Sequence, residues 1–131
     1  MLKQERIALV IDDDDRASEV LRRFLEAEGF SVVCAISAED ALAMVPRQTL
    51  VLITLDLQMY GMNGWQFLLK LRESGQLAEV PVIIVSGRPI VDHLAESRGA
   101  SALLQKPINR VKLKATLANL GLLQTQSGFA G

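Results

Sequence analysis

The chain has 131 residues, a length that fits a single domain. Half of the residues are hydrophobic and 22% are charged, the balance of a compact folded protein rather than a disordered one. Its 14 basic and 15 acidic residues give a net charge of −1, and no basic stripe interrupts that balance, so we expect no direct binding of nucleic acid.

The apolar runs are strand-sized and far short of the ~20 residues that cross a bilayer, so we expect no membrane insertion. The polar start, Met1 to Arg6, is unlike a signal peptide. The single cysteine, Cys34, excludes an internal disulfide, and its apolar surroundings predict a buried strand position. A reducing cytoplasm is the expected location.

Short apolar runs alternate with helix-period segments along the whole chain. Five runs are predicted as strands: Ala8–Ile11, Ser31–Ala35, Val51–Leu55, Val82–Ser86 and Ala102–Leu104. Most lack polar alternation, as expected when both faces of a sheet are covered. The pattern predicts an α/β fold with a parallel sheet and helices on both sides.

Helices are predicted between these strands. The first carries apolar residues from Ala17 to Leu25 and ends at Gly29. The second starts at Ser37, with Asp40 as the capping-box acid, and is followed by Pro46. A third runs from Gly64 to Ser74, and a short fourth covers about Ile90 to Arg98.

The last predicted helix starts after Asn109, its cap, and directs Leu113, Leu117 and Leu120 to the sheet. A second, weakly apolar stripe consists of Val111, Ala115, Ala118 and Leu122. It is either a contact surface, open to phosphorylation-linked homodimer formation, or an alanine-rich exposed face. Residues 124–131 form a polar tail.

Polar residues stand where four of the strands end. Asp12 to Asp15 follow the first strand, Asp56 the third, Ser86 the fourth and Lys106 the fifth. Ligands bind beyond the carboxyl ends of parallel strands, so these groups form the candidate site. Clustered carboxylates repel one another unless a cation intervenes, and oxygen ligands favour Mg²⁺, with Mn²⁺ as a substitute.

An aspartate at the end of a buried strand can act as a nucleophile and accept a phosphoryl group. Phosphoryl transfer then requires neutralisation of charge on the equatorial oxygens. A metal ion, the ammonium of Lys106 and the hydroxyl of Ser86 supply it.

The chain resembles the receiver domain of two-component response regulators from about Arg6 to Leu123. Four motifs carry the resemblance in family order: Leu9-Val10-Ile11-Asp12-Asp13, Asp56-Leu57-Gln58-Met59 leading to Gly64, Ser86-Gly87, and Lys106-Pro107. The resemblance implies a doubly wound, flavodoxin-like (βα)5 fold with five parallel strands in the order 2-1-3-4-5. It implies a receiver domain over residues 1–123.

The resemblance also implies a role for each site residue. Asp56 is the phosphoacceptor, assisted by Ser86 and Lys106. Asp13, the Asp56 carboxylate and the Gln58 main-chain carbonyl bind Mg²⁺ directly, and Asp12 binds it through water. Asp14 and Asp15 are expected to be bystanders.

The implied donor is a histidine kinase or a histidine phosphotransfer protein, and the implied target is an unknown downstream protein. Such a chain catalyses its own phosphorylation and dephosphorylation and is not a turnover enzyme. Phosphorylation is expected to draw in Ser86 and remodel the face of helix four, strand five and helix five.

Several positions depart from the family pattern. Tyr60 replaces a common proline, Leu103 replaces the usual rotating aromatic residue, and the stretch from Ser86 to Gly99 is short. Arg88 is either a phosphoryl contact or a solvated arginine. His93 is expected on a helix surface.

Two alternatives remain open at this point. A receiver-like module could bind partners without phosphorylation, which Leu103 and Tyr60 favour. A phosphohydrolase of the haloacid dehalogenase type is more remote, because its nucleophile belongs to the first strand and Arg16 stands where that family has Thr or Ser.

Overall fold

A computed structural model describes residues 6–44, 50–58, 64–73, 79–87 and 99–123. Nine elements lie in these ranges: β1 (Ile7–Ile11), α1 (Asp15–Ala27), β2 (Ser31–Ala35), α2 (Ala38–Met44), β3 (Leu50–Asp56), α3 (Gly64–Glu73), β4 (Val82–Ser86), β5 (Ala102–Gln105) and α5 (Arg110–Asn119). The predicted fourth helix, at residues 90–98, lies outside the described ranges.

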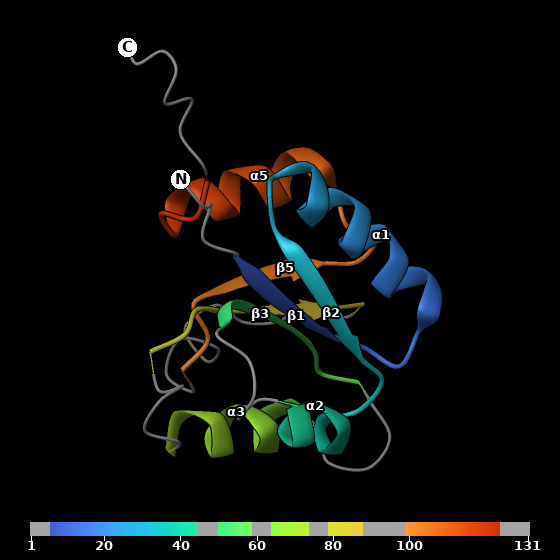
Figure 1. Ribbon diagram of the computed structural model, residues 1–131, viewed down its shortest axis with the longest axis vertical. Coiled ribbons are helices and arrows are strands. Elements are labelled where there is room, and N and C mark those ends of the chain that lie inside the picture. Colours follow the sequence, from blue (N-terminus) through green and yellow to red (C-terminus); the bar gives the residue numbers. More distant parts are fainter. Residues whose placement is uncertain (1–5, 45–49, 59–63, 74–78, 88–98, 124–131) are drawn as a thin grey trace, which may run out of the picture.

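The five strands form one parallel sheet in the order β2-β1-β3-β4-β5. Helices α1 and α5 cover one face and α2 and α3 the other (Figure 1). The predicted strand order is confirmed. The observed strands exceed the predicted ones by one or two residues at β1, β3 and β5, because pairing with neighbouring strands extends each past its apolar run.

Two apolar clusters lie on opposite faces of the sheet. One packs β1, β3 and β4 against α2 and α3 through residues such as Phe67 and Leu68. The other packs the same strands against α1 and α5 through Leu21, Leu113 and Leu117. Every residue of β4 is buried. This burial on both faces explains why the strands read as continuous apolar runs.

Helix α1 begins with a side-chain cap that the sequence analysis missed. The Asp14 carboxylate accepts hydrogen bonds from the backbone N–H groups of Arg16 and Ala17, at 2.9 and 3.4 Å. Asp14 therefore caps α1, because it satisfies donors that a helix start leaves unpaired. The predicted stop is confirmed, since Gly29 follows the helix with a φ of 95°.

The predicted caps of α2 and α5 are both present. Ser37 accepts a hydrogen bond from the Asp40 N–H at 2.9 Å, and Asn109 accepts one from the Lys112 N–H at 3.0 Å. On α5, Val111, Ala115 and Ala118 are exposed, as the predicted second stripe requires. Leu122 does not belong to that stripe: it follows the end of α5 and packs against the α1/α5 cluster.

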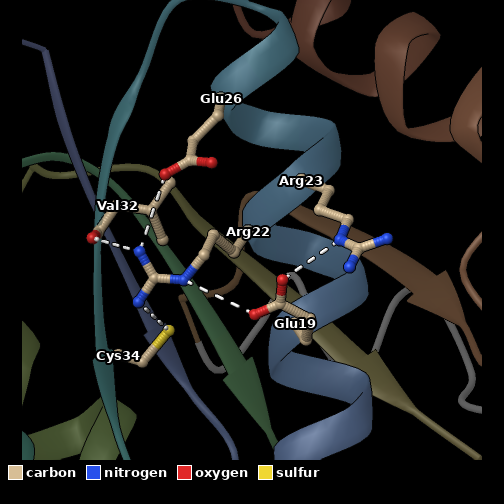
Figure 2. A network of polar contacts seen from close by, with 6 residues as sticks. All are labelled: Glu19, Arg22, Arg23, Glu26, Val32 and Cys34. Carbon is tan, nitrogen blue, oxygen red and sulfur yellow. Dashed lines mark hydrogen bonds and ion pairs between the residues drawn. The ribbon is translucent and has the colours of Figure 1, made fainter.

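Cys34 is only half-buried, contrary to the prediction of a buried strand position. The reason is that β2 is an edge strand, covered by the long side chain of Arg22 from α1 (Figure 2). The Arg22 guanidinium donates to the Cys34 sulfur at 3.4 Å and to the Val32 carbonyl at 3.3 Å. It also lies 3.6 Å from the Glu26 carboxylate, so this network fixes α1 on β2.

Among the residues described, no helix is both long enough and apolar enough to span a bilayer.

Candidate functional site

The predicted site residues lie where β1, β3, β4 and β5 end, at the carboxyl edge of the sheet. Ile11 pairs with Leu55 across β1 and β3, so Asp12 and Asp56 follow these partners side by side. Asp56 is in register with Val85, and Ser86 with Gln105, which brings the ends of β4 and β5 to the same edge. The parallel sheet thus gathers residues that are distant in sequence.

Three carboxylates converge at this edge. One ligand oxygen from each of Asp12, Asp13 and Asp56 lies within 4.8 Å of the other two. Asp12 and Asp56 are buried, at 2% and 4% exposure, whereas Asp13 is exposed. The cluster therefore has one open side and two buried acids at its base.

Local backbone geometry orients the two buried carboxylates. The Asp14 N–H donates to Asp12 Oδ1 at 2.9 Å, and the Gln58 N–H donates to Asp56 Oδ1 at 3.0 Å. Each bond spans two residues and turns the chain back on the carboxylate that ends the strand. The second oxygen of each carboxylate is directed to other partners.

Lys106 brings a positive charge to both buried acids. Its Nζ atom lies 2.9 Å from Asp12 Oδ2 and 3.5 Å from Asp56 Oδ2. Burial by itself would lower the pKa of Lys106, but the contact with Asp12 and the charges of both acids outweigh it and raise the pKa. Lys106 is therefore a permanent cation in this site. The peptide bond between Lys106 and Pro107 is cis.

Opposing effects act on the pKa of Asp56. Burial raises its pKa, and the neighbouring Asp12 raises it further, against the lowering effects of the Gln58 N–H and Lys106. Asp12 Oδ2 is buried and accepts no hydrogen bond of good geometry, and the nearby ammonium is its counter-charge. One ammonium therefore balances only part of the negative charge of the two buried carboxylates.

A divalent cation fits this donor set. The three carboxylates offer oxygen atoms, the ligands that Mg²⁺ and Mn²⁺ prefer. Such an ion would relieve the repulsion that raises the pKa of Asp56.

Gly64 has a role at the site that the sequence analysis did not assign. A Cβ atom there would lie 2.8 Å from Leu57 Cδ2, 2.9 Å from Leu57 Cα and 3.0 Å from the Asp56 carbonyl oxygen. The first residue of α3 therefore packs directly on the backbone that holds Asp56. A glycine at a helix start eight residues after an acidic strand end is the signal that could have revealed this contact.

Leu103, which replaces the aromatic residue of the family pattern, is partly buried and packs against the α2/α3 cluster. The side chain of Ser86 is buried at the end of β4. Tyr60, Arg88 and His93 lie outside the described residues.

These features define a class: a parallel α/β domain with an acidic, lysine-containing site at the carboxyl edge of its sheet. The model of the response regulator receiver domain matches residues 8–118. The chain therefore belongs to the family of response regulator receiver domains of two-component signalling. This membership decides against the phosphohydrolase alternative.

Relatives and solved structures agree with this family. The sensory/regulatory protein RpfC of Xanthomonas campestris is 35% identical over 90% of this chain, which spans 17% of that protein. The response regulator Rre1 of Synechocystis is 32% identical over 94% of this chain, which spans 54% of it. The chain thus spans about half or less of these relatives.

Among solved structures, a response regulator receiver protein from Pseudomonas putida has a TM-score of 0.79 and 27% identity. It matches over 90% of this chain and 99% of its own. The chemotaxis protein CheY4 of Vibrio cholerae has a TM-score of 0.82 with 24% identity, over 88% of this chain and 98% of its own, and it supports the fold alone.

Proposed function

We propose that this receiver domain, residues 1–123, accepts a phosphoryl group on Asp56 and acts as a phosphorylation switch, with residues 124–131 as a tail. The observation that carries the proposal is the cluster of Asp12, Asp13 and Asp56, whose oxygens lie within 4.8 Å of one another beside Lys106. Asp56 is the proposed nucleophile because it ends the central strand and its Oδ2 atom faces the ammonium.

Asp13, Asp56 and the Gln58 carbonyl would hold Mg²⁺ directly, and Asp12 would hold it through water. When bound, Mg²⁺ supplies positive charge that neutralises the phosphoryl oxygens and orients them for in-line attack. The raised pKa of Asp56 supports this requirement, because the site disfavours its own negative charge without a cation.

In the transfer, an Asp56 carboxylate oxygen forms a bond to phosphorus while the bond from phosphorus to an imidazole nitrogen of the donor histidine breaks. The imidazole keeps the electron pair and takes a proton from solvent. Lys106 donates to a phosphoryl oxygen, and it can do so once it leaves the Asp56 carboxylate 3.5 Å away. Ser86, at the end of β4, donates its hydroxyl to another oxygen.

The proposed donor is a histidine kinase or a histidine phosphotransfer protein, and the receiver is the component that is modified rather than an enzyme that turns over substrate. The signal is proposed to leave through β5, α5 and the segment between β4 and β5. Leu103 lacks the polar, rotating ring of an aromatic switch, so the change in this face depends on packing against the α2/α3 cluster.

The test is incubation of the protein with Mg²⁺ and phosphoramidate, a small phosphodonor, followed by measurement of intact mass. We expect one added phosphoryl group, about 80 Da, in the wild type and none in Asp56→Asn. Lys106→Met should be labelled more slowly than the wild type, because it lacks the ammonium beside Asp56 that would donate to the phosphoryl oxygen. EDTA should abolish labelling.

Absence of labelling in the wild type with Mg²⁺ would contradict the proposal. It would favour the interaction module that binds partners without phosphorylation. Labelling that persists in Asp56→Asn would assign the acceptor to another residue.

A further inference from the structure

Thr54 is a polar residue among the apolar residues of β3, two positions before Asp56. Only 1% of it is exposed. Its Oγ1 atom has no hydrogen-bond partner among the residues that the structure describes. A buried hydroxyl group without a partner destabilises a fold, so a partner for this one has to be sought.

The register of the sheet places Thr54 on the face that α1 and α5 cover. Thr54 pairs with Val10 of β1 and Ile83 of β4, and both of these residues belong to the apolar cluster of that face. Side chains two residues apart in a strand lie on the same face. Thr54 therefore neighbours Asp56 along β3. It lies diagonally across from Asp12, because Asp12 follows Val10 by two residues.

A second buried atom with the same deficit lies across from this hydroxyl. Asp12 Oδ2 and Thr54 Oγ1 are the two buried side-chain atoms in the described ranges that lack a hydrogen bond of good geometry. Lys106 Nζ lies 2.9 Å from Asp12 Oδ2 and 3.5 Å from Asp56 Oδ2, so the ammonium approaches Asp12 from the side of β3. Asp12 Oδ2 is therefore directed toward the strand that carries Thr54. A carboxylate oxygen has two lone pairs, and one ammonium leaves the second available.

We propose that Thr54 Oγ1 and Asp12 Oδ2 hold one buried water molecule, and that Thr54 thereby positions Asp12 for Mg²⁺. The Thr54 hydroxyl donates to the water oxygen, and the water donates to Asp12 Oδ2. Diagonal neighbours on a sheet face lie ~7–8 Å apart. A water with two hydrogen bonds of ~2.8 Å joins atoms up to ~5.6 Å apart, and the side chains cover the remaining distance. Lys106 Nζ, beside the same carboxylate oxygen, is a third polar group for this water.

The inference rests on the proposed Mg²⁺ site and adds a residue that acts through Asp12. In the proposed transfer, Lys106 turns from the carboxylates to a phosphoryl oxygen. The water remains as a donor to Asp12 Oδ2, so the carboxylate keeps its orientation while the ammonium moves. Thr54 is a positioning residue, because it contacts neither the metal nor the phosphoryl group.

The first test compares two variants of Thr54 by titration calorimetry with Mg²⁺. Thr54→Val keeps the shape of the side chain and removes the hydroxyl, whereas the conservative variant Thr54→Ser keeps the hydroxyl. Loss of a partner behind a metal-binding side chain typically weakens metal binding ~10–100-fold, so Thr54→Val should raise the Kd about tenfold. Thr54→Ser should restore the Kd to within about threefold of the wild type. The matched control is Thr116→Val, which removes a hydroxyl that bonds to the Lys112 carbonyl on α5 and should leave the Kd unchanged.

Two measurements in EDTA test the water without the metal. Replacement of an idle buried hydroxyl by a methyl group raises Tm, whereas loss of a hydrogen-bonded water should lower Tm by about 3 °C in Thr54→Val. A crystal structure of the wild type should contain a water within hydrogen-bond distance of both Thr54 Oγ1 and Asp12 Oδ2. The crystal structure of Thr54→Val should lack it.

A higher Tm for Thr54→Val in EDTA, or a crystal structure in which Thr54 Oγ1 bonds to a main-chain carbonyl and to no water, overturns the water site. An unchanged Kd for Mg²⁺ in Thr54→Val overturns the positioning role. A wild type that binds no Mg²⁺ and accepts no phosphoryl group from phosphoramidate would mean that the proposed function itself has failed. The two measurements in EDTA would still decide whether Thr54 and Asp12 share a water.

Discussion

The amino and carboxyl edges of the sheet differ in the polar groups that they bring together. At the amino edge, Arg72 of α3 donates to the Val80 carbonyl at 2.7 Å and to the Gly99 carbonyl at 2.8 and 3.1 Å. Arg6 donates there to the carbonyls of Glu28 and Leu122. At the carboxyl edge, Asp12 and Asp56 face each other with Lys106 as their shared cation.

This difference separates stability from function. An arginine that donates to neutral carbonyls satisfies them without repulsion, so the amino edge stabilises the fold. The carboxyl edge places like charges together, and the pKa of Asp56 is raised mainly by burial and then by Asp12. A bound cation would reduce this repulsion. Groups with perturbed pKa values are typical of functional sites, so the carboxyl edge is the candidate functional site. Substitutions at the two edges should therefore have different effects.

The largest expected effect is at the amino edge. Arg72→Met removes three charged hydrogen bonds to two carbonyls and should lower the free energy of unfolding by about 3 kcal/mol. The corresponding fall in Tm is about 10 °C. Thermal unfolding followed by circular dichroism measures it, and Lys70→Met on the exposed side of the same helix is the control. A Tm within 2 °C of the wild type would show that Arg72 does not secure this edge.

A steric change at the carboxyl edge comes next. Gly64→Ala would place a Cβ atom 2.9 Å from Leu57 Cα, and we expect a loss of about 2 kcal/mol in stability together with weaker Mg²⁺ binding. Gly87→Ala is the matched control, because its Cβ would meet only Gln58 Oε1, at 4.0 Å. Equal unfolding midpoints in urea for the two variants would contradict the close packing of α3 on Asp56.

Neutralising one acid should stabilise the protein when Mg²⁺ is absent. Two unit charges about 4 Å apart repel by ~1 kcal/mol even in water. Asp56→Asn should therefore raise Tm in EDTA by about 3 °C. The increase of Tm on addition of Mg²⁺ should be smaller than in the wild type. Glu73→Gln, an exposed acid at the end of α3, should change neither value. A lower Tm for Asp56→Asn in EDTA would mean that the ionised carboxylate stabilises the fold.

The smallest effect is the pH dependence of that repulsion. The folded-state pKa of Asp56 lies above its unfolded-state value, so its contribution to stability is present below the unfolded pKa and is lost as pH rises through the folded pKa. Urea midpoints in EDTA should thus fall more steeply with rising pH in the wild type than in Asp56→Asn across that window. Parallel curves would exclude Asp56 as the titrating group.

Much of the fold is predictable from local pattern. Apolar runs of three to five residues predict the strands, and Gly29, Ser37 and Asn109 mark the ends of three helices by their backbone or capping chemistry. The site position is predictable as well, because polar residues end four strands and parallel strands share one carboxyl edge. These signals lie within a few residues of the features that they predict.

The sequence by itself determined the strands, most helix ends and the candidate site residues, since these follow from short-range periodicity and residue chemistry. Only the tertiary structure decided the capping role of Asp14, the half-exposure of Cys34 under Arg22, and the packing of Gly64 on Asp56. It also brought carboxylate oxygens of Asp12 and Asp13, two of the four consecutive aspartates, within 4.8 Å of one from Asp56. The reason is physical: burial and repulsion depend on atoms brought together across the sheet, and the distances between those atoms are not contained in any local stretch of sequence.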